Sequence, residues 1–257
     1  MEVLVINAFA EDRLLGNPAG VYFVESFPPD SEMLRIAARV GTSETSFVQN
    51  RKDDFFIRWW TPETEVALCG HATLAAAHAI WQNGYTGKTI RFASNNYDLS
   101  AETEADIITM EFPLVAAKKC AEPEKLSEIL GTEIIHTGKT RFDYLVELRG
   151  EDDVAAVRPD FEKLKNLDCR GVIVTSVSAR DGYDFVLRFF TPSVGIDEDP
   201  VTGSAHSSLA PYWSEKTGKK KMKSLQLSQR GGIVRVEVAG GGVKIGGKAV
   251  MSGYVKL

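Results

Sequence analysis

RWWTP, at residues 58–62, recurs as RFFTP at residues 188–192, which lie 130 positions further along the chain. Identical residues elsewhere keep the same offset, namely Asp30 and Asp160, Glu32 and Glu162, Leu34 and Leu164, Gly41 and Gly171, and Asp54 and Asp184. A repeat of about half the chain is too long for a solenoid unit of roughly 20–50 residues. The pattern instead predicts two similar domains facing a cleft, which is a common place for a ligand.

Most segments predict short strands, and few predict helices. The matched strands at 54–60 and 184–190 each end at Thr-Pro, and glycine-rich turns separate the last strands of the chain. Helices are predicted at 70–83 and 203–216, and the first is apolar on nearly every side, as a buried helix is. We therefore predict an α+β fold of two pseudo-symmetric domains. Each domain is a mostly antiparallel β-sheet or barrel wrapped around a central buried helix.

The domain limits follow from the repeat and from a break in the pattern after its first half. We expect an N-terminal repeat domain over residues 1–117 and a C-terminal repeat domain over residues 118–257. The final strand of the chain could instead belong to the N-terminal domain. Two further helices are predicted from acidic capping residues, with Asp30 opening one that runs to Val40 and Asp160 opening its copy.

Composition narrows the class of protein. A net charge of -5 gives no reason to expect a nucleic-acid partner. The longest apolar run, at 66–81, has 16 residues and two histidines, short of the roughly 20 residues that span a bilayer. The N-terminus lacks the basic region and long apolar stretch of a signal peptide, so we expect a cytoplasmic protein that binds no membrane.

The cysteines and histidines form no compact ligand motif. Cys69, Cys120 and Cys169 are scattered, which predicts neither a disulfide framework nor a zinc ribbon. A metal site built from Cys69, His71, His78 and His206 is an open alternative, but it lacks the usual ligand spacing. The chain also lacks the glycine-rich motifs of nucleotide-binding loops. We therefore predict no metal and no cofactor.

Each of the two buried helices is predicted to begin with a glycine, Gly70 in the first half and Gly203 in the second. The start of a helix carries free N–H groups and about half a positive charge, so two such starts could hold a carboxylate or an enolate-like oxygen. The alternative is a pair of capped helices with no ligand. Acidic residues precede both starts and are expected to serve the helix dipole or to face water, namely Glu63, Glu65, Asp197 and Glu198.

Glu44 lies in a polar segment that leads into an apolar strand, and its partner at offset 130 is Val174. The first half therefore carries a carboxylate where the second half is expected to carry an apolar side chain. A lone glutamate in a loop is most often solvated, so its pattern alone leaves both a solvated and a catalytic role open.

Four groups of residues, taken in order, carry a resemblance to a known family. They are NAF at 7–9 with GNPAGV at 16–21, SETSF at 43–47, TP at 61–62 with LCGHAT at 68–73, and EDPVTGSAH at 198–206. Together they resemble the phenazine-biosynthesis isomerase family (PhzF-like proteins), which is related in fold to diaminopimelate epimerase. The resemblance covers nearly the whole chain.

The resemblance implies a cofactor-free isomerase that acts as a homodimer on a small carboxylated molecule. In the family's characterised member, a glutamate moves a proton within an unsaturated cyclic amino acid. The motif matches imply a catalytic set of Glu44, His71 and Asp199 and a substrate-binding set of Gly70, Gly203 and Ser204. We expect these residues to converge on one cleft between the halves.

Physical chemistry suggests what each residue would do. A carboxylate screened from water has a raised pKa and can take up and return a proton, which suits Glu44. His71 would anchor an amino or hydroxyl group of the substrate or assist proton transfer. Asp199 would bind a substrate ammonium group or orient His71.

Two alternatives to this reading bear on function. The related epimerases use one cysteine from each half, and Cys69 could mimic the first, but residues 202–204 hold no thiol. We therefore expect Cys69 to be a small buried residue. A non-catalytic protein that binds a small molecule or another protein on the same fold remains open, because the motifs do not name a substrate.

Overall fold

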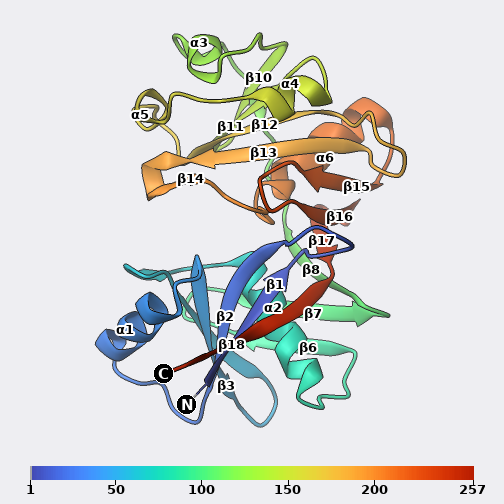
Figure 1. Cartoon of the computed structure of the whole chain (residues 1–257). Helices are drawn as coiled ribbons and strands as arrows, with labels where there is room; N and C mark the ends of the chain where they lie inside the picture. Colours follow the sequence, from blue (N-terminus) through green and yellow to red (C-terminus); the bar gives the residue numbers. More distant parts are fainter. Residues whose placement is uncertain (1) are drawn as a thin grey trace. The chain divides into compact units, whose positions relative to one another are not determined.

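The computed structural model describes residues 2–257, and the chain forms two compact units (Figure 1). The first unit combines the residues up to Glu111 with Gly246–Leu257, and the second is Phe112–Ile245. The last strand, β18 (Ala249–Lys256), pairs antiparallel with the first strand, β1 (Glu2–Ala8). The C-terminal strand therefore belongs to the first unit.

The first unit is a mostly antiparallel sheet with two parallel pairings. Its other elements are β2 (Asn17–Val24), α1 (Asp30–Val40), β3 (Glu44–Asn50), β4 (Phe55–Trp60), β5 (Glu65–Val66), α2 (Gly70–Gln82), β6 (Thr89–Ala93), β7 (Asp98–Glu104) and β8 (Ile107–Pro113). The parallel pairs are β2 with β3 and β4 with β6. A parallel pair needs a crossover connection, and α1 and α2 supply the two crossovers.

The second unit repeats this order. Its elements are β9 (Lys118–Lys119), α3 (Leu126–Leu130), β10 (His136–Lys139), β11 (Asp143–Glu147), α4 (Glu151–Ala156), α5 (Phe161–Leu164), β12 (Gly171–Val177), β13 (Phe185–Thr191), the short 3₁₀ helix η1 (Pro192–Val194), β14 (Ile196–Glu198), α6 (His206–Thr217), β15 (Lys221–Gln226), β16 (Gly232–Ala239) and β17 (Gly242–Gly247). Here β11 pairs parallel with β12, and β13 with β15. The predicted α+β fold with two similar halves is confirmed.

The strand registers correct the counterpart that we assigned to Glu44. Thr45 pairs with Trp60 in the first unit, and Val172 pairs with Phe190 in the second. Trp60 and Phe190 keep the offset of 130, but Thr45 and Val172 differ by 172 − 45 = 127. The counterpart of Glu44 is therefore Gly171 and not Val174. The cause is the turn before the matched strand, which spans residues 51–54 in the first unit and the longer stretch 178–184 in the second.

Helix α2 lies in the core of the first unit, as its composition predicted. Nine of its residues are buried, from His71 near its start to Ile80 near its end. It packs against β1, β2 and β3 (Figure 1), and its alanines allow those strands to approach closely.

Helix α6 begins at His206, three residues later than the sequence predicted. The reason is a side chain that competes for a backbone acceptor. The His206 imidazole Nδ1 donates to the Thr202 carbonyl at 2.8 Å, and the His206 amide bonds to the Gly203 carbonyl instead, at 3.0 Å. Gly203 consequently lies in a turn before the helix, whereas Gly70 is the first residue of α2.

The two predicted acidic caps differ in the structure. Asp160 caps α5, because its carboxylate accepts from the Lys163 amide at 3.2 Å. The predicted helix from Asp30 to Val40 is confirmed as α1, but Asp30 does not cap it, because the cap position is held by Pro29 without a side-chain hydrogen bond. The Asp30 carboxylate instead accepts from Arg58 at 2.9 Å.

Candidate functional site

Glu44 and His71, two of the predicted catalytic residues, meet in the first unit. Glu44 is the first residue of β3, and His71 is the second residue of α2. The Oε2 atom of Glu44 lies 3.2 Å from the Nε2 atom of His71, and their side chains are only 17% and 9% exposed. The glutamate is therefore not a solvated loop residue.

The local backbone explains why these two side chains meet. The Thr42 hydroxyl accepts from the Gly20 amide at 3.1 Å and donates to the Glu44 carbonyl at 2.8 Å, which fixes the start of β3 on β2. The Ser46 hydroxyl donates to the Ala72 carbonyl at 3.0 Å, which ties β3 to the first turn of α2.

A second set of bonds fixes the start of α2 on β4. The Trp59 indole N–H donates to the Thr73 hydroxyl at 3.0 Å, and that hydroxyl donates to the Cys69 carbonyl at 2.6 Å. The same carbonyl accepts the first intrahelical bond, from the Thr73 amide at 3.1 Å. The amides of Gly70 and His71 precede that bond and lack an intrahelical acceptor, so they can bind an anion.

The two ring nitrogens of His71 face different partners. Ser43 Oγ lies 3.2 Å from Nε2, on the same side as Glu44. Cys69 Sγ lies 3.5 Å from Nδ1, on the other side. The imidazole therefore lies between a carboxylate and a thiol.

Electrostatics correct our expectation for Glu44. Burial raises the pKa of its carboxyl group, but the charge of His71 and hydrogen bonds from His71, Ser43 and Cys69 outweigh burial, and the net pKa is lowered. Burial lowers the pKa of His71, yet its contacts with Cys69 and Glu44 raise it well above its ordinary value. A carboxylate and an imidazolium therefore coexist near neutral pH as an ion pair across the contact of 3.2 Å.

The other predicted residues lie in the second unit. The Asp199 carboxylate accepts from the Thr202 hydroxyl at 2.6 Å, and Gln226 holds this turn by donating to the Asp199 carbonyl at 2.7 Å. Gly203 is buried and Ser204 is exposed. Each unit thus presents its own part of the predicted set.

The register also identifies a residue that sequence reasoning missed. At the offset of 127, Arg170 is the counterpart of Ser43, just as Gly171 is the counterpart of Glu44. Arg170 donates to Ser204 Oγ at 3.5 Å, whereas Ser43 contacts His71. A Cβ atom at Gly171 would lie 2.6 Å from Thr191 Cγ2, so the second unit has no room for a side chain there. In the sequence, Arg170 stands directly before Gly171, the counterpart of Glu44. The uniform offset of 130 concealed this relation.

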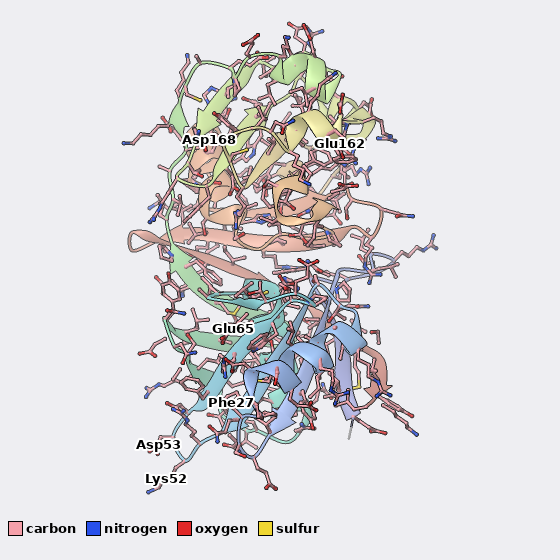
Figure 2. All side chains as sticks on the ribbon, turned by 90° about the vertical axis from the view of Figure 1, so that its left-hand side faces the viewer. Phe27, Lys52, Asp53, Glu65, Glu162 and Asp168 are labelled. Atoms are coloured by element: carbon pink, nitrogen blue, oxygen red, sulfur yellow. The ribbon has the colours of Figure 1, made fainter. Side chains whose placement is uncertain are left out.

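Two of the acidic residues that we expected to serve a dipole or face water do neither. Glu65 forms a two-bond ion pair with Arg58, both contacts at 2.7 Å, and Glu198 forms the same pair with Arg188 at 2.7 and 2.8 Å (Glu65 is labelled in Figure 2). Glu63 and Asp197 are exposed, as predicted. The repeat therefore preserves one arginine–glutamate pair in each unit.

Among residues 2–257, one group of side chains is close enough together to hold a metal ion. It consists of Glu44, Cys69 and His71, whose ligand atoms lie within 4.8 Å of one another. The contacts do not favour a single ion, because the carboxylate faces one ring nitrogen and the thiol faces the other. One ion cannot take the lone pairs of both nitrogens of a ring. His206 bonds to Thr202 and Ser224 through its two nitrogens and offers no ligand atom.

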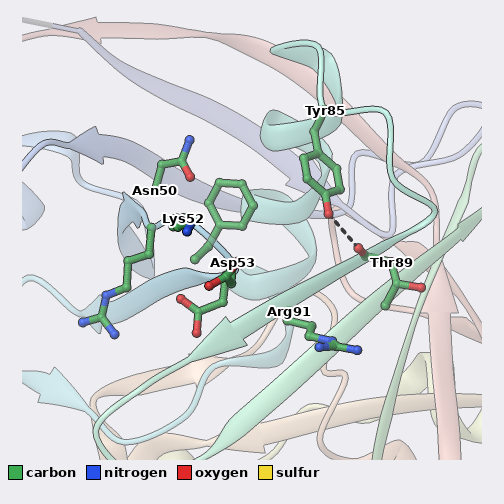
Figure 3. Close-up of a pocket in the computed structure, with 9 residues that line it drawn as sticks. Asn50, Lys52, Asp53, Tyr85, Thr89 and Arg91 are labelled. Carbon is green, nitrogen blue, oxygen red and sulfur yellow. Dashed lines mark hydrogen bonds between the residues drawn. The ribbon is translucent and has the colours of Figure 1, made fainter.

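A surface pocket of about 430 Å³ lies at the turn between β3 and β4 in the first unit (Figure 3). Charged and aromatic residues line it, among them Lys52, Asp53, Tyr85 and Arg91, and none of the predicted site residues does.

Among the helices described over residues 2–257, none is both long and apolar enough to cross a membrane.

The family follows from a comparison with known proteins. Residues 6–253 match the model of the family described as phenazine biosynthesis-like protein. The chain belongs to this family. The match covers almost the whole described chain, including β3 with Glu44, α2 with His71 and the residue Asp199 after β14.

Individual relatives agree with this family membership. A Pseudomonas aeruginosa protein named an uncharacterized isomerase is 44% identical over 100% of this chain and 99% of its own. A crystal structure of a PhzF-family protein from Enterococcus faecalis has a TM-score of 0.95 with 37% identity and covers 100% and 99% of the two chains. The relatives' names support the isomerase class.

A more distant likeness concerns the fold alone. A hydroxyproline epimerase from Agrobacterium vitis, solved with bound trans-4-hydroxy-L-proline, has a TM-score of 0.63 at 14% identity and covers 100% and 90% of the two chains. The epimerase-like fold that the sequence predicted is thereby confirmed.

Proposed function

We propose that this protein is a cofactor-independent isomerase that moves a proton within a small carboxylated substrate, with Glu44 as the proton-transfer group. The observation that carries the proposal is the buried contact of 3.2 Å between the Glu44 carboxylate and the His71 imidazole. Family membership and the names of the relatives support the isomerase class.

Glu44 is suited to this role by its charge and by its buried position beside His71. Its lowered pKa keeps the side chain ionised near neutral pH, ready to accept a proton from carbon. Its oxygen Oε2 lies 3.2 Å from Nε2 of His71, so the ring holds the carboxylate in place for the transfer. One C–H bond of the substrate breaks as the carboxyl O–H bond forms, and the same proton is returned to a different atom of the substrate.

The negative charge left on the substrate needs stabilisation. The amides of Gly70 and His71 at the start of α2 and the positive charge of His71 supply it on the side of the first unit. We propose that Gly203, Ser204 and Asp199 of the second unit contact the substrate as well. Arg170 is added to this set, because its side chain reaches Ser204.

The substrate class follows from these groups. A carboxylate suits the helix-start amides, and an amino group suits Asp199, so we propose a cyclic or otherwise amino-acid-like carboxylate. The bound hydroxyproline of the distant epimerase is an example of such a molecule. We further propose that the protein is a cytoplasmic homodimer, which light scattering of the purified protein tests.

Hydrogen exchange in deuterated water tests the function. Proline, trans-4-hydroxy-L-proline, dehydroproline and a cyclohexadiene amino acid are incubated with the protein and followed by proton NMR. The wild type is expected to exchange a carbon-bound hydrogen of at least one probe. The exchange rate of Glu44→Gln is expected to be lower by a factor of about 10² to 10⁴. Tight binding of a probe without exchange would instead indicate a binding protein.

A further inference from the structure

Cys69 occupies a defined place in the site that the proposed mechanism leaves unused. It is the residue before α2, with an extended backbone, and its carbonyl is held by two bonds from Thr73. Its side chain is buried, and Sγ lies 3.5 Å from Nδ1 of His71. The position of the sulfur is therefore set by the start of the helix rather than by loose packing.

The second unit has the same arrangement with different atoms. The offset of 133 that relates Glu65 to Glu198 also relates Cys69 to Thr202. The Thr202 hydroxyl donates to the Asp199 carboxylate at 2.6 Å, and the Cys69 thiol is among the donors that lower the pKa of Glu44. In both units the residue before the glycine thus offers a proton to a carboxylate, which simple packing does not require.

We propose that Cys69 is a positioning residue of the proton-transfer site, and that its thiol, the His71 imidazole and the Glu44 carboxylate share their protons as one unit. The sulfur accepts from Nδ1–H, which keeps the ring doubly protonated and turned with Nε2–H toward Glu44. The role of Cys69 in proton transfer to a substrate rests on the proposed function. The sharing of protons among the three side chains is a property of the protein without substrate.

The groups facing the ring define its titration. They are the carboxylate of Glu44 from β3, the thiol of Cys69 before α2 and the uncharged hydroxyl of Ser43. Burial and the charge of Glu44 raise the pKa of Cys69, so the thiol stays protonated while the ring is charged. When Glu44 takes up the substrate's proton, the imidazolium still balances the negative charge, which has moved to the substrate. No electrons are gained or lost by the protein.

Histidine NMR titration of the whole protein tests the proposal without a substrate. The chain has four histidines, and burial lowers the pKa of His78, His136 and His206, so His71 is distinct in having a raised pKa. In Cys69→Ala the pKa of His71 is expected to fall, because the ring loses the acceptor at Nδ1. Cys69→Ser, which restores an acceptor, is expected to recover part of the shift.

The control is Cys169→Ala, a cysteine of the second unit that should leave the His71 titration unchanged. If circular dichroism shows that Cys69→Ala does not fold, Cys69→Ser gives the same test, with a smaller decrease in the pKa of His71. Identical His71 titrations in wild type and both Cys69 variants would overturn the proposal.

The exchange assay adds a readout that separates positioning from packing. Exchange that requires the imidazolium falls as pH rises through the pKa of His71, so Cys69→Ala should move this alkaline limb to lower pH. A packing role would lower the rate by the same factor at every pH and would contradict the proposal. If Glu44→Gln exchanges as fast as wild type, the proposed function fails, and the NMR titration still decides whether the three groups share protons.

Discussion

At the scale of single residues, the same pair of repeats holds two histidines with opposite electrostatics. His71 faces Glu44 and Cys69, and its pKa is raised well above the ordinary value. His206 is buried among uncharged groups, with Nδ1 bonded to the Thr202 carbonyl and Nε2 to the Ser224 hydroxyl, and its pKa is lowered to about 4. One histidine is therefore suited to proton chemistry, and the other is a neutral part of the core.

His206 makes the fold sensitive to acid. Because its folded pKa is about 4 and its ordinary value is 6.5, the unfolded chain binds a proton between these values that the folded chain does not, and stability falls as pH is lowered. At pH 5 the loss is about 2 kcal/mol. Urea unfolding at pH 7 and pH 5 should show this drop in wild type but not in His206→Asn. Equal drops in the two proteins would contradict the assignment.

At the scale of elements, the start of each buried helix and the first residue of β3 or β12 decide where chemistry can occur. Gly171 begins β12 at the place of Glu44, and a Cβ there would lie 2.6 Å from Thr191 Cγ2 and 2.7 Å from the Phe190 carbonyl oxygen. The second unit is closed at this point by close packing of strands. The asymmetry of the predicted site thus has a steric cause.

Gly171→Ala tests this close approach. The added methyl group must push β12 and β13 apart, so we expect a loss of about 1–3 kcal/mol in the free energy of unfolding, measured by urea. Gly150→Ala is the matched control, because nothing lies within 4 Å of a Cβ at Gly150. It should cost less than about 1 kcal/mol, the preference for glycine over alanine at a helix cap. A loss at Gly171 no greater than in the control would contradict the packing argument.

The sequence predicted elements better than it predicted their ends. The all-round apolar pattern found α2 to within a residue, because a helix buried on every side leaves a distinct composition. The start of α6 was missed, because it depends on the His206 ring taking a carbonyl that lies four residues back. Glu44 and His71 were found through motifs, but their mutual charge was not, since a pKa depends on neighbours that only the fold brings together.

At the scale of the whole molecule, the chain is a duplicated scaffold whose repeats keep the same arginine–glutamate ion pair. Arg58 pairs with Glu65 and Arg188 with Glu198. The second pair is the more buried, and Arg188 also donates to the Val157 carbonyl at 2.7 Å, which ties the segment after α4 to β13. The offset of 130 residues between the repeats could be read from the sequence. Its variation from 127 to 133 could not, because the length of a turn leaves no recognisable sequence pattern.

Replacing each arginine by methionine compares the two repeats. Arg188→Met leaves the largely buried Glu198 carboxylate without its arginine and removes one of the two arginine donors to the Val157 carbonyl, so we expect a loss of about 3–5 kcal/mol. Arg58→Met acts on a more exposed pair and should cost roughly 1 kcal/mol. Thermal and urea unfolding of both variants measures the difference. A larger loss for Arg58→Met would show that burial does not set the strength of the pair.

The central claim is that the Glu44 carboxylate moves the substrate's proton. Its most direct test is the rate of carbon-bound hydrogen exchange in deuterated water for wild type, Glu44→Gln and Glu63→Gln, with Asp199→Asn as a further variant. Glu63 lies in the same unit, is exposed and loses the same charge, so its variant should exchange like wild type. We predict that Glu44→Gln falls by about 10² or more while remaining folded, and that Asp199→Asn weakens probe binding. Exchange by Glu44→Gln at the wild-type rate would contradict the account.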